Sequence, residues 1–164
     1  MSDLLDLRIV NEAWHLGPCA EVRVGDHVTR YVRRGTGPSV VLVGADVDTN
    51  PVWRPLVERL ESGHRIVVPQ PPPANADVTA WLRGFIEGLG LTSVVLIAGN
   101  GSSAAALELA TADDFLVRRL VLMPNAGAPI GDASPERMLW VKPDDSPTHS
   151  LQRIEEFIAD DRAA

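Results

Sequence analysis

The sequence predicts a single α/β domain in which a mostly parallel sheet of about seven strands carries helices on both faces. Three observations support this prediction. Short apolar runs alternate with longer amphipathic segments, which is typical of parallel strands joined by helices. A hairpin pattern precedes this alternation and predicts two antiparallel strands at the start of the sheet. The chain has 164 residues, enough for one domain with a sizeable core.

The antiparallel pair is predicted over residues 20–24 and 27–34. Alternating apolar and polar residues flank Gly25-Asp26 there, which is typical of a hairpin turn. The later strands are predicted from short continuous apolar runs, as expected for strands buried on both faces. These runs are 39–45, 65–69, 93–97 and 119–123 at the centre of the sheet, with a further strand at 137–143. Residues 1–19 form a lead-in, so the domain is predicted over residues 20–164.

Helices are predicted between these strands. One covers residues 51–63 and ends at Gly63, a residue type that often follows a helix. Another covers residues 78–90, and Asp77 is placed to cap its first turn. The apolar stripe of this second helix is expected to belong to the core and consists of Trp81, Leu82, Phe85, Ile86 and Leu89. The remaining helices are predicted from residue 104 onward and over 150–161.

Composition and charge exclude several classes of function. Hydrophobic residues make up 45% of the chain and charged residues 23%, as in an ordinary globular protein. The net charge of −7 argues against a nucleic-acid partner, and the cluster of Arg30, Arg33 and Arg34 is interpreted as solvated surface. No apolar run reaches about 18 residues, so no membrane span is expected. The single Cys19 excludes an internal disulfide and, with no secretory signal at the N-terminus, predicts a cytoplasmic protein.

The most informative segment spans residues 92–110 and predicts a buried strand, a very tight turn and a helix. Small residues flank the turn, so strand and helix can approach closely. The tip residue, Asn100, belongs to the non-glycine types that best tolerate the positive φ expected there. The segment is also compatible with an ordinary glycine-rich joint and, through Gly99-x-Gly101-x-x-Ala104, with a dinucleotide-binding fingerprint. That fingerprint normally opens the first βαβ unit and precedes an acidic residue, whereas here it lies in mid-chain and no acid follows.

Four segments form a wider pattern. They read GTGPSVVLVGADVDTNPVWRPLVERL, RIVVPQPPP, VTAWLRGFIEGLGLTSVVLIAGNGSSAAALELA and LVRRLVLMPNAGAP. With these segments in this order, the chain resembles the α/β-hydrolase family over residues 20–164. The resemblance implies an α/β-hydrolase-like sheet with a nucleophile elbow at residues 98–103. The insertion that usually forms a cap is reduced to about residues 126–136 and one late strand has no counterpart, so no cap domain is expected.

The residues that matter most for hydrolysis depart from the family's pattern. Asn100 stands where the family has its nucleophilic serine, and a histidine base cannot activate an amide as it activates a hydroxyl. Gly44-Ala45, followed by Asp46, stands where the family usually has His-Gly in the loop that lines the oxyanion hole. Gln70 replaces the usual aspartate after the next strand. We therefore expect no serine-hydrolase activity.

A ligand site is expected where loops meet at the carboxyl ends of the strands. Asn100 is the predicted carbonyl-polarising donor, Asp46 the predicted acid or base, and His149 the alternative proton carrier. The predicted substrate-binding residues are Gly44, Ala45, Gln70, Gly101, Ser102 and Asn125. His149 shares a late loop with Asp144 and Asp145, where the family carries its acid and histidine, although Asp-Asp-Ser-Pro is equally a good turn and helix cap. No metal and no cofactor are expected.

Three functions are compatible with these residues. The first is a degenerate α/β-hydrolase-like protein that binds a small organic molecule and catalyses, at most, a non-hydrolytic proton transfer or cyclisation. The second is a non-catalytic interaction or scaffold subunit. The third is a true hydrolase with relocated catalytic residues, in which Ser102 or Ser103 acts from a shifted elbow. We also expect a homodimer, because the absent cap and strand leave a surface to which Met138 and Trp140 can belong.

Overall fold

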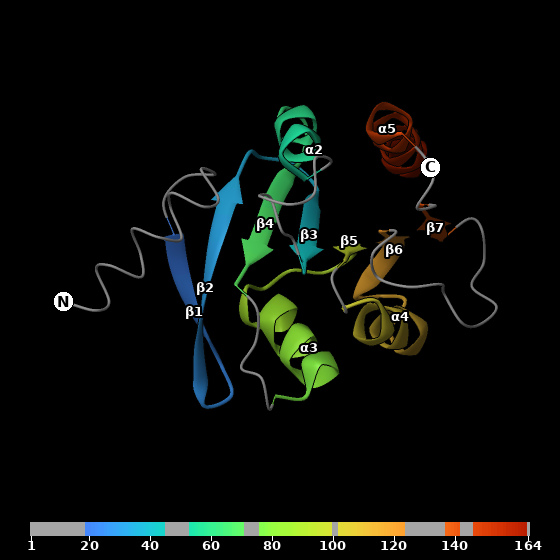
Figure 1. Cartoon of the computed structure of the whole chain (residues 1–164). Helices are drawn as coiled ribbons and strands as arrows, with labels where there is room; N and C mark the ends of the chain where they lie inside the picture. Colours follow the sequence, from blue (N-terminus) through green and yellow to red (C-terminus); the bar gives the residue numbers. More distant parts are fainter. Residues whose placement is uncertain are drawn as a thin grey trace.

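The computed structural model describes residues 19–44, 53–70, 76–99, 102–123, 137–141 and 146–163. They form a seven-stranded sheet in the order β1-β2-β4-β3-β5-β6-β7, with helices on both faces (Figure 1). The strands are β1 (Cys19–Val24), β2 (His27–Arg34), β3 (Ser39–Val43), β4 (Arg65–Pro69), β5 (Val94–Ala98), β6 (Val117–Leu122) and β7 (Met138–Trp140). The described helices are α2 (Trp53–Leu60), α3 (Val78–Gly88), α4 (Ser103–Ala112) and α5 (Pro147–Ala163). The predicted α/β class and the predicted number of strands are confirmed.

The first two strands form the predicted hairpin. β1 pairs antiparallel with β2, and Val24 lies opposite His27 across the turn. Gly25 takes a φ of 59° in this turn, a conformation that glycine adopts at little steric cost. β2 then pairs antiparallel with β4, whereas all further pairs, from β3–β4 to β6–β7, are parallel. The sheet is therefore mixed at its start and parallel thereafter.

Two hydrophobic layers cover the sheet, one on each face. α2 and α5 pack on one face, and α3 and α4 pack on the other (Figure 1). Because side chains alternate along a strand, β3 sends Val40 and Leu42 into the first layer and Val41 and Val43 into the second. All residues of β5 are buried, and this strand lies between β3 and β6. The prediction that β5 is a central strand is confirmed.

The helix α3 illustrates how local sequence fixes both ends of an element. Asp77 is its N-cap, and the side-chain oxygen accepts a hydrogen bond from the Ala80 N–H at 3.2 Å. At the other end Gly90 takes a φ of 71°, and the N–H groups of Gly90 and Leu91 donate to carbonyls of the last helical turn. This pattern is a Schellman motif, the usual way in which a glycine ends a helix.

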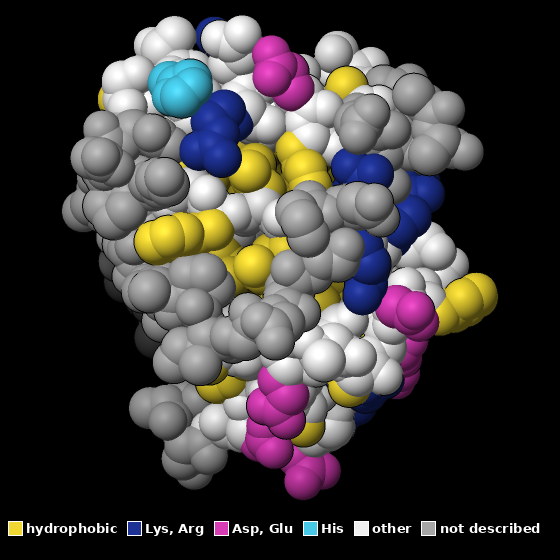
Figure 2. Space-filling view, turned by 90° about the vertical axis from the view of Figure 1, so that its right-hand side faces the viewer, with side chains coloured by type: hydrophobic (Ala, Val, Ile, Leu, Met, Phe, Trp, Pro, Cys, Tyr) yellow, Lys and Arg dark blue, Asp and Glu magenta, His cyan; other side chains and the backbone are white. Residues whose placement is uncertain are grey.

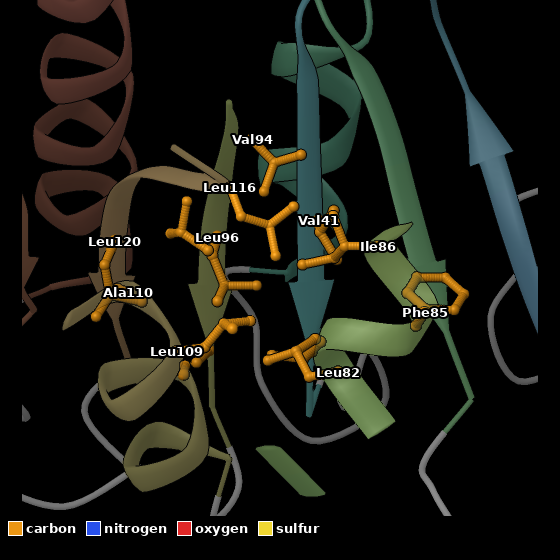
Figure 3. Packing of buried hydrophobic residues seen from close by; sticks show 14 of the residues in the cluster. Val41, Leu82, Phe85, Ile86, Val94, Leu96, Leu109, Ala110, Leu116 and Leu120 are labelled. Atoms are coloured by element: carbon orange, nitrogen blue, oxygen red, sulfur yellow. The ribbon is translucent and has the colours of Figure 1, made fainter. Parts of the chain in front are cut away.

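The apolar stripe of α3 packs against the sheet, as Figure 3 shows for Leu82, Phe85 and Ile86. Trp81 is buried as well, and its indole N–H donates to the hydroxyl of Thr29 at 3.0 Å. The indole N–H therefore has a hydrogen-bond partner although the ring lies inside the core. The stripe belongs to the core, as the sequence predicted.

Two inner boundaries differ from the prediction by a few residues. α2 ends at Leu60 rather than at residue 63, because the chain then turns and the Gly63 N–H donates to the Leu60 carbonyl at 3.1 Å. β5 begins at Val94, and Ser93 takes a φ of 54° just before it. Ser93 is the one non-glycine residue with positive φ in the part of the chain that the structure describes.

The last helix, α5, begins at Pro147 rather than at residue 150. Ser146 caps it, since the Ser146 hydroxyl accepts a hydrogen bond from the N–H of His149 at 3.2 Å. Proline suits the first helical position, where its missing N–H has no partner to lose. The buried side chains Leu151, Ile154 and Ile158 fix α5 on the sheet. None of the described helices combines the length and the apolar character needed to cross a membrane.

Polar side chains tie α4 to its neighbours. Asp113, directly after α4, accepts hydrogen bonds from the Leu116 N–H and from Arg83 of α3, both at 2.9 Å. These hydrogen bonds hold the pKa of the Asp113 carboxyl below its ordinary value of 3.8, and the bond from the Leu116 N–H has a larger effect than the bond from the Arg83 guanidinium. Arg137, just before β7, donates to three backbone carbonyls of α4 and β6. These are the carbonyls of Ala110 at 3.2 Å, Val117 at 2.9 Å and Arg118 at 3.3 Å.

Candidate functional site

The turn between β5 and α4 is closed by its own backbone. The N–H of Ser102 donates to the carbonyl oxygen of Gly99 at 3.0 Å, the bond between the first and fourth residues of a β-turn. Asn100 and Gly101 are the two central residues of this turn by sequence, and both lie outside the described residues. The predicted strand and helix on either side of this turn are confirmed, while the positive φ of Asn100 stays a prediction.

The end of β3 packs directly on this turn. Gly44 takes a φ of 70°, and a Cβ placed on it would overlap the carbonyl oxygen of Gly99 and lie 3.0 Å from the Ser102 Oγ. The Gly99 N–H donates in turn to the carbonyl of Val43 at 3.0 Å. Glycine alone fits both the backbone angle and the space at position 44. Gly44 and Ser102, two of the predicted substrate-binding residues, are therefore neighbours.

Ser102 occupies the N-cap position of α4 without using its side chain as a cap. Its hydroxyl makes no capping hydrogen bond, and the side chain is half-buried beside Gly44. The first turn of α4 adds backbone N–H groups at the positive end of the helix dipole. A hydroxyl and helical N–H donors thus share the carboxyl edge of the sheet.

Two more strands end at the same edge. Met123 follows β6, and its N–H donates to the carbonyl of Ala98 at 2.8 Å, so the end of β6 is held beside the turn after β5. Gln70 follows β4 and is half-buried. The Gln70 N–H donates to the carbonyl of Arg30 at 2.8 Å, which holds Gln70 toward β2. The structure therefore joins Gly44 and Ser102 and places Gln70 at a neighbouring strand end.

His149 lies in the first turn of α5 and is exposed, whereas the prediction placed it in the preceding loop. The helix extends back to it because Ser146 and Pro147 supply the cap and the first helical residue. Its role as proton carrier stays a prediction. The other predicted residues lie outside the described residues: Ala45, Asp46, Asn100, Gly101 and Asn125, together with Asp144 and Asp145.

The described residues at this edge carry no charge. The residues are Gly44, Gly99, Ser102, Gln70 and Met123. The N–H groups of the last four are already bonded within the chain, so the Ser102 hydroxyl and the Gln70 side-chain amide are the groups that this set offers to a ligand. Within the described ranges, no three His, Cys, Asp or Glu side chains lie together so that they could hold a metal ion. This set of groups can bind and orient a neutral polar molecule by hydrogen bonds.

Sequence reasoning did not single out Gly99 and Met123 as residues of the site. Gly99 contributes a donor to Val43 and an acceptor to Ser102, so it joins β3, β5 and α4 at one point. A glycine directly after a buried strand often marks a close approach of two backbones, and that signal was present. Met123 acts through its backbone N–H, so its residue type gave no signal.

No protein-family model and no curated protein sequence matches the chain. Solved structures do match it. A bromoperoxidase from Bacillus anthracis gives a TM-score of 0.53 at 18% identity, over 65% of this chain and 44% of that chain. A haloalkane dehalogenase loop variant from Bradyrhizobium elkanii gives 0.53 at 21% identity, over 64% and 39%. An epoxide hydrolase from Vigna radiata gives 0.58 at 19% identity, over 74% and 43%.

The chain spans less than half of the length of these three structures. Their names describe three different activities, so the likeness selects a fold and no reaction. The strand order also differs from that of a dinucleotide-binding domain, in which the glycine-rich turn follows the first strand of a parallel sheet. The mixed sheet, the closed turn after β5 and the matched structures agree with one another, and the chain has the α/β-hydrolase fold.

Proposed function

We propose that the chain is a degenerate α/β-hydrolase-like protein that binds a small organic molecule at the carboxyl edge of its sheet. In this proposal it does not hydrolyse the molecule through a serine nucleophile. The observation that carries the proposal is the hydrogen bond from the Ser102 N–H to the Gly99 carbonyl. This bond joins Gly99 to Ser102, and the two residues between them in the sequence include Asn100, at the position where the family carries its nucleophile. An amide has no hydroxyl or thiol proton for a base to remove.

Asn100 supplies binding instead of attack in this proposal. Its amide can donate a hydrogen bond, and in the sequence Asn100 precedes the first turn of α4 by a few residues. Donors that act together on one carbonyl oxygen stabilise negative charge on it. Asp46 and His149 are the proposed proton carriers if the bound molecule undergoes a proton transfer or a cyclisation. The uncharged surroundings formed by Gly44 and Ser102 favour a neutral carbonyl compound over an ion.

The proposed partners follow from charge and cysteine content. The net charge of −7 disfavours nucleic acid, so the partner is a small molecule and, as argued below, a second copy of the chain. The single cysteine, Cys19, fits a reducing compartment, and we place the protein in the cytoplasm.

One observation favours an alternative, a hydrolase with a relocated nucleophile. The Ser102 hydroxyl is not used as a cap and lies beside Gly44, at the edge where a substrate would bind. A fluorophosphonate probe followed by intact-protein mass spectrometry separates the two functions. We expect no labelled protein, and no turnover of p-nitrophenyl acetate above that of Ser102→Ala. Stoichiometric labelling that Ser102→Ala abolishes would establish the alternative.

Binding is tested with p-nitroacetanilide, an amide that keeps a carbonyl group and resists spontaneous hydrolysis. We expect saturable shifts of the backbone amide signals of Gly44, Gly99 and Ser102 in an NMR titration. Asn100→Gly keeps the turn, because glycine tolerates a positive φ, and should lose the shifts while its spectrum stays dispersed. Unchanged binding by Asn100→Gly would mean that Asn100 serves the turn geometry alone. Absence of binding by the unmodified protein would favour a scaffold role.

A further inference from the structure

A hollow of about 80 Å³ lies at the opposite end of the strands from the closed turn. Its lining residues come from β2, β4 and the segment after α3. They are Tyr31, Arg33, Arg65, Val67, Leu89 and Leu91. Arg65 is the first residue of β4, whereas Gln70 follows its last residue. This hollow is therefore separate from the site of the proposed function.

Two arginine side chains reach this hollow from the same face of the sheet. Arg33 lies opposite Val67 in the pairing of β2 with β4, and Arg65 lies two residues along β4 from Val67. Diagonal neighbours of this kind in an antiparallel pair are about 7–8 Å apart, within reach of two long side chains that converge on one group. Val67 belongs to the core layer of α3, so both arginines stand on the α3 face.

Neither the Arg33 side chain nor the Arg65 side chain has a hydrogen bond or an ion pair with another described residue, and none of the lining residues is acidic. The other two arginines of β2, in contrast, form ion pairs. Arg34 pairs with Glu61 at 2.7 Å, and Arg30 pairs with Glu21 at 3.5 Å. The cluster that the sequence suggested to be solvated surface thus contains two neutralised arginines and one, Arg33, that faces the hollow.

The end of α3 does not need these arginines as caps. Helix carbonyls attract cations when they lack a partner. Here Leu89, Gly90 and Leu91 use their own N–H groups for this purpose. They donate to the carbonyls of Phe85 at 3.2 Å, Glu87 at 2.9 Å and Ile86 at 3.1 Å, respectively. The two guanidinium groups therefore keep their donors for a group from outside the chain.

We propose that this hollow binds the carboxylate or phosphate group of a small ligand. Guanidinium groups recognise both oxyanions through charge-assisted hydrogen bonds. The surface of the hollow is mainly polar, and Leu89 and Leu91 are among the apolar residues that line it, where a short hydrocarbon part of the ligand can make contact. The hollow is small, so it accommodates one such group and not a whole nucleotide. The net charge of −7 disfavours the approach of an anion to the chain as a whole. Binding at the hollow therefore depends on the local positive charge of Arg33 and Arg65.

The test is an NMR titration of the full chain with sodium phosphate in one series and sodium isobutyrate in another. Ionic strength is held constant with sodium chloride, because exposed charges are screened by salt. We expect at least one anion to give saturable shifts of the Arg33 and Arg65 side-chain Nε–H signals and of the amides of Leu89 and Leu91. Arg33→Met and Arg65→Met should each weaken the affinity by about tenfold or more, while Arg54→Met should leave it unchanged. Arg54 is a suitable control because it is exposed on α2, on the other face of the sheet.

The two series also identify the source of the oxyanion. Saturation with phosphate alone assigns the hollow to phosphate esters, and saturation with isobutyrate alone assigns it to small carboxylic acids. Shifts that rise linearly with both salts, or that persist in Arg33→Met and Arg65→Met, would overturn the proposal. The result is independent of p-nitroacetanilide binding, so failure here leaves the proposed function at the other edge untouched.

Discussion

Two glycines decide how closely β3 and the turn after β5 approach each other. Gly44 has a φ of 70° and no room for a Cβ, because the carbonyl of Gly99 occupies that space. Gly99 uses its N–H and its carbonyl to join Val43 and Ser102. The geometry of the candidate site is therefore set by backbone contacts between residues without side chains.

A comparison of two glycines tests this contact. Gly44→Ala should lower the free energy of unfolding by about 2 kcal/mol or more, because it adds a steric overlap to the cost of a left-handed backbone. Gly25→Ala is the matched control, since Gly25 has a φ of 59° but no atom within 4 Å of the added Cβ. It should lose only about 1 kcal/mol. Urea denaturation measures both, and equal losses would show that the Gly99 contact contributes nothing.

At the scale of elements, α3 and α4 are joined by a charged contact at their ends. Asp113 accepts from the Leu116 N–H and from Arg83, and these donors lower its pKa in the folded protein. A carboxyl with a lowered folded-state pKa stabilises the protein above its unfolded pKa. That contribution is lost as the pH falls through the folded-state pKa.

The pH dependence of Asp113→Asn tests this contact. The unmodified protein should be more stable than Asp113→Asn at pH 7, and the difference should shrink as the pH falls below about 4, near the ordinary pKa. Asp114→Asn is the control, because Asp114 is exposed and makes no hydrogen bond or ion pair within the described residues. Chemical denaturation at several pH values gives the two curves. A difference that does not change with pH would exclude the charge of Asp113 as the cause.

The short strand β7 depends on Arg137. Its guanidinium joins carbonyls of α4 and β6, and its own carbonyl accepts from the Leu120 N–H at 2.7 Å. Arg137→Met should raise hydrogen exchange at Leu120 and Val141 by roughly tenfold or more, since lost bonds to a charged group cost about 1–3 kcal/mol. Arg54→Met, a change on an exposed face of α2, should leave these amides unchanged. NMR measures the amide hydrogen exchange. Equal exchange rates in Arg137→Met and Arg54→Met would contradict a stabilising role of Arg137 for β7.

At the scale of the whole molecule, we propose that two copies associate through the side that carries α5 and β7. β7 pairs with β6 and with no other described strand, and its three residues are half-buried. Figure 2 looks onto this side and shows hydrophobic side chains next to basic ones. A second copy would cover both the apolar groups and the edge of the sheet. Light scattering should give the mass of a dimer, and a monomer at high protein concentration would exclude this association.

Much of the fold was predictable because its signals are local. Continuous apolar runs identified the buried strands, and Gly25-Asp26 identified the hairpin. The start of α5 was missed, although Ser146 and Pro147 are a known cap pair, because the loop before them suggested catalytic residues instead. The order of the strands beyond the hairpin depends on pairs far apart in the sequence, and local patterns do not reveal it.

The candidate site was predictable in place but not in detail. Gly44 and Ser102 were expected at one edge of the sheet, and they lie together there. Their contact runs through the Gly99 backbone. The small residues of the segment indicated a close approach, but not which strand end would pack on Gly99. The hollow at Arg33 was missed for a similar reason, since the absence of an acidic partner appears only when the strands are paired.

The position of β3 has a consequence for how the chain is made. Val40 pairs with Ile66 on one side and with Val95 on the other, so β3 draws its two neighbours from separate parts of the chain. When the ribosome has made the residues through β4, one edge of β3 still lacks its partner. An unpaired apolar strand edge invites pairing with other nascent chains. Throughout the interval between the synthesis of β4 and that of β5, an apolar edge of the nascent sheet therefore lacks its native partner.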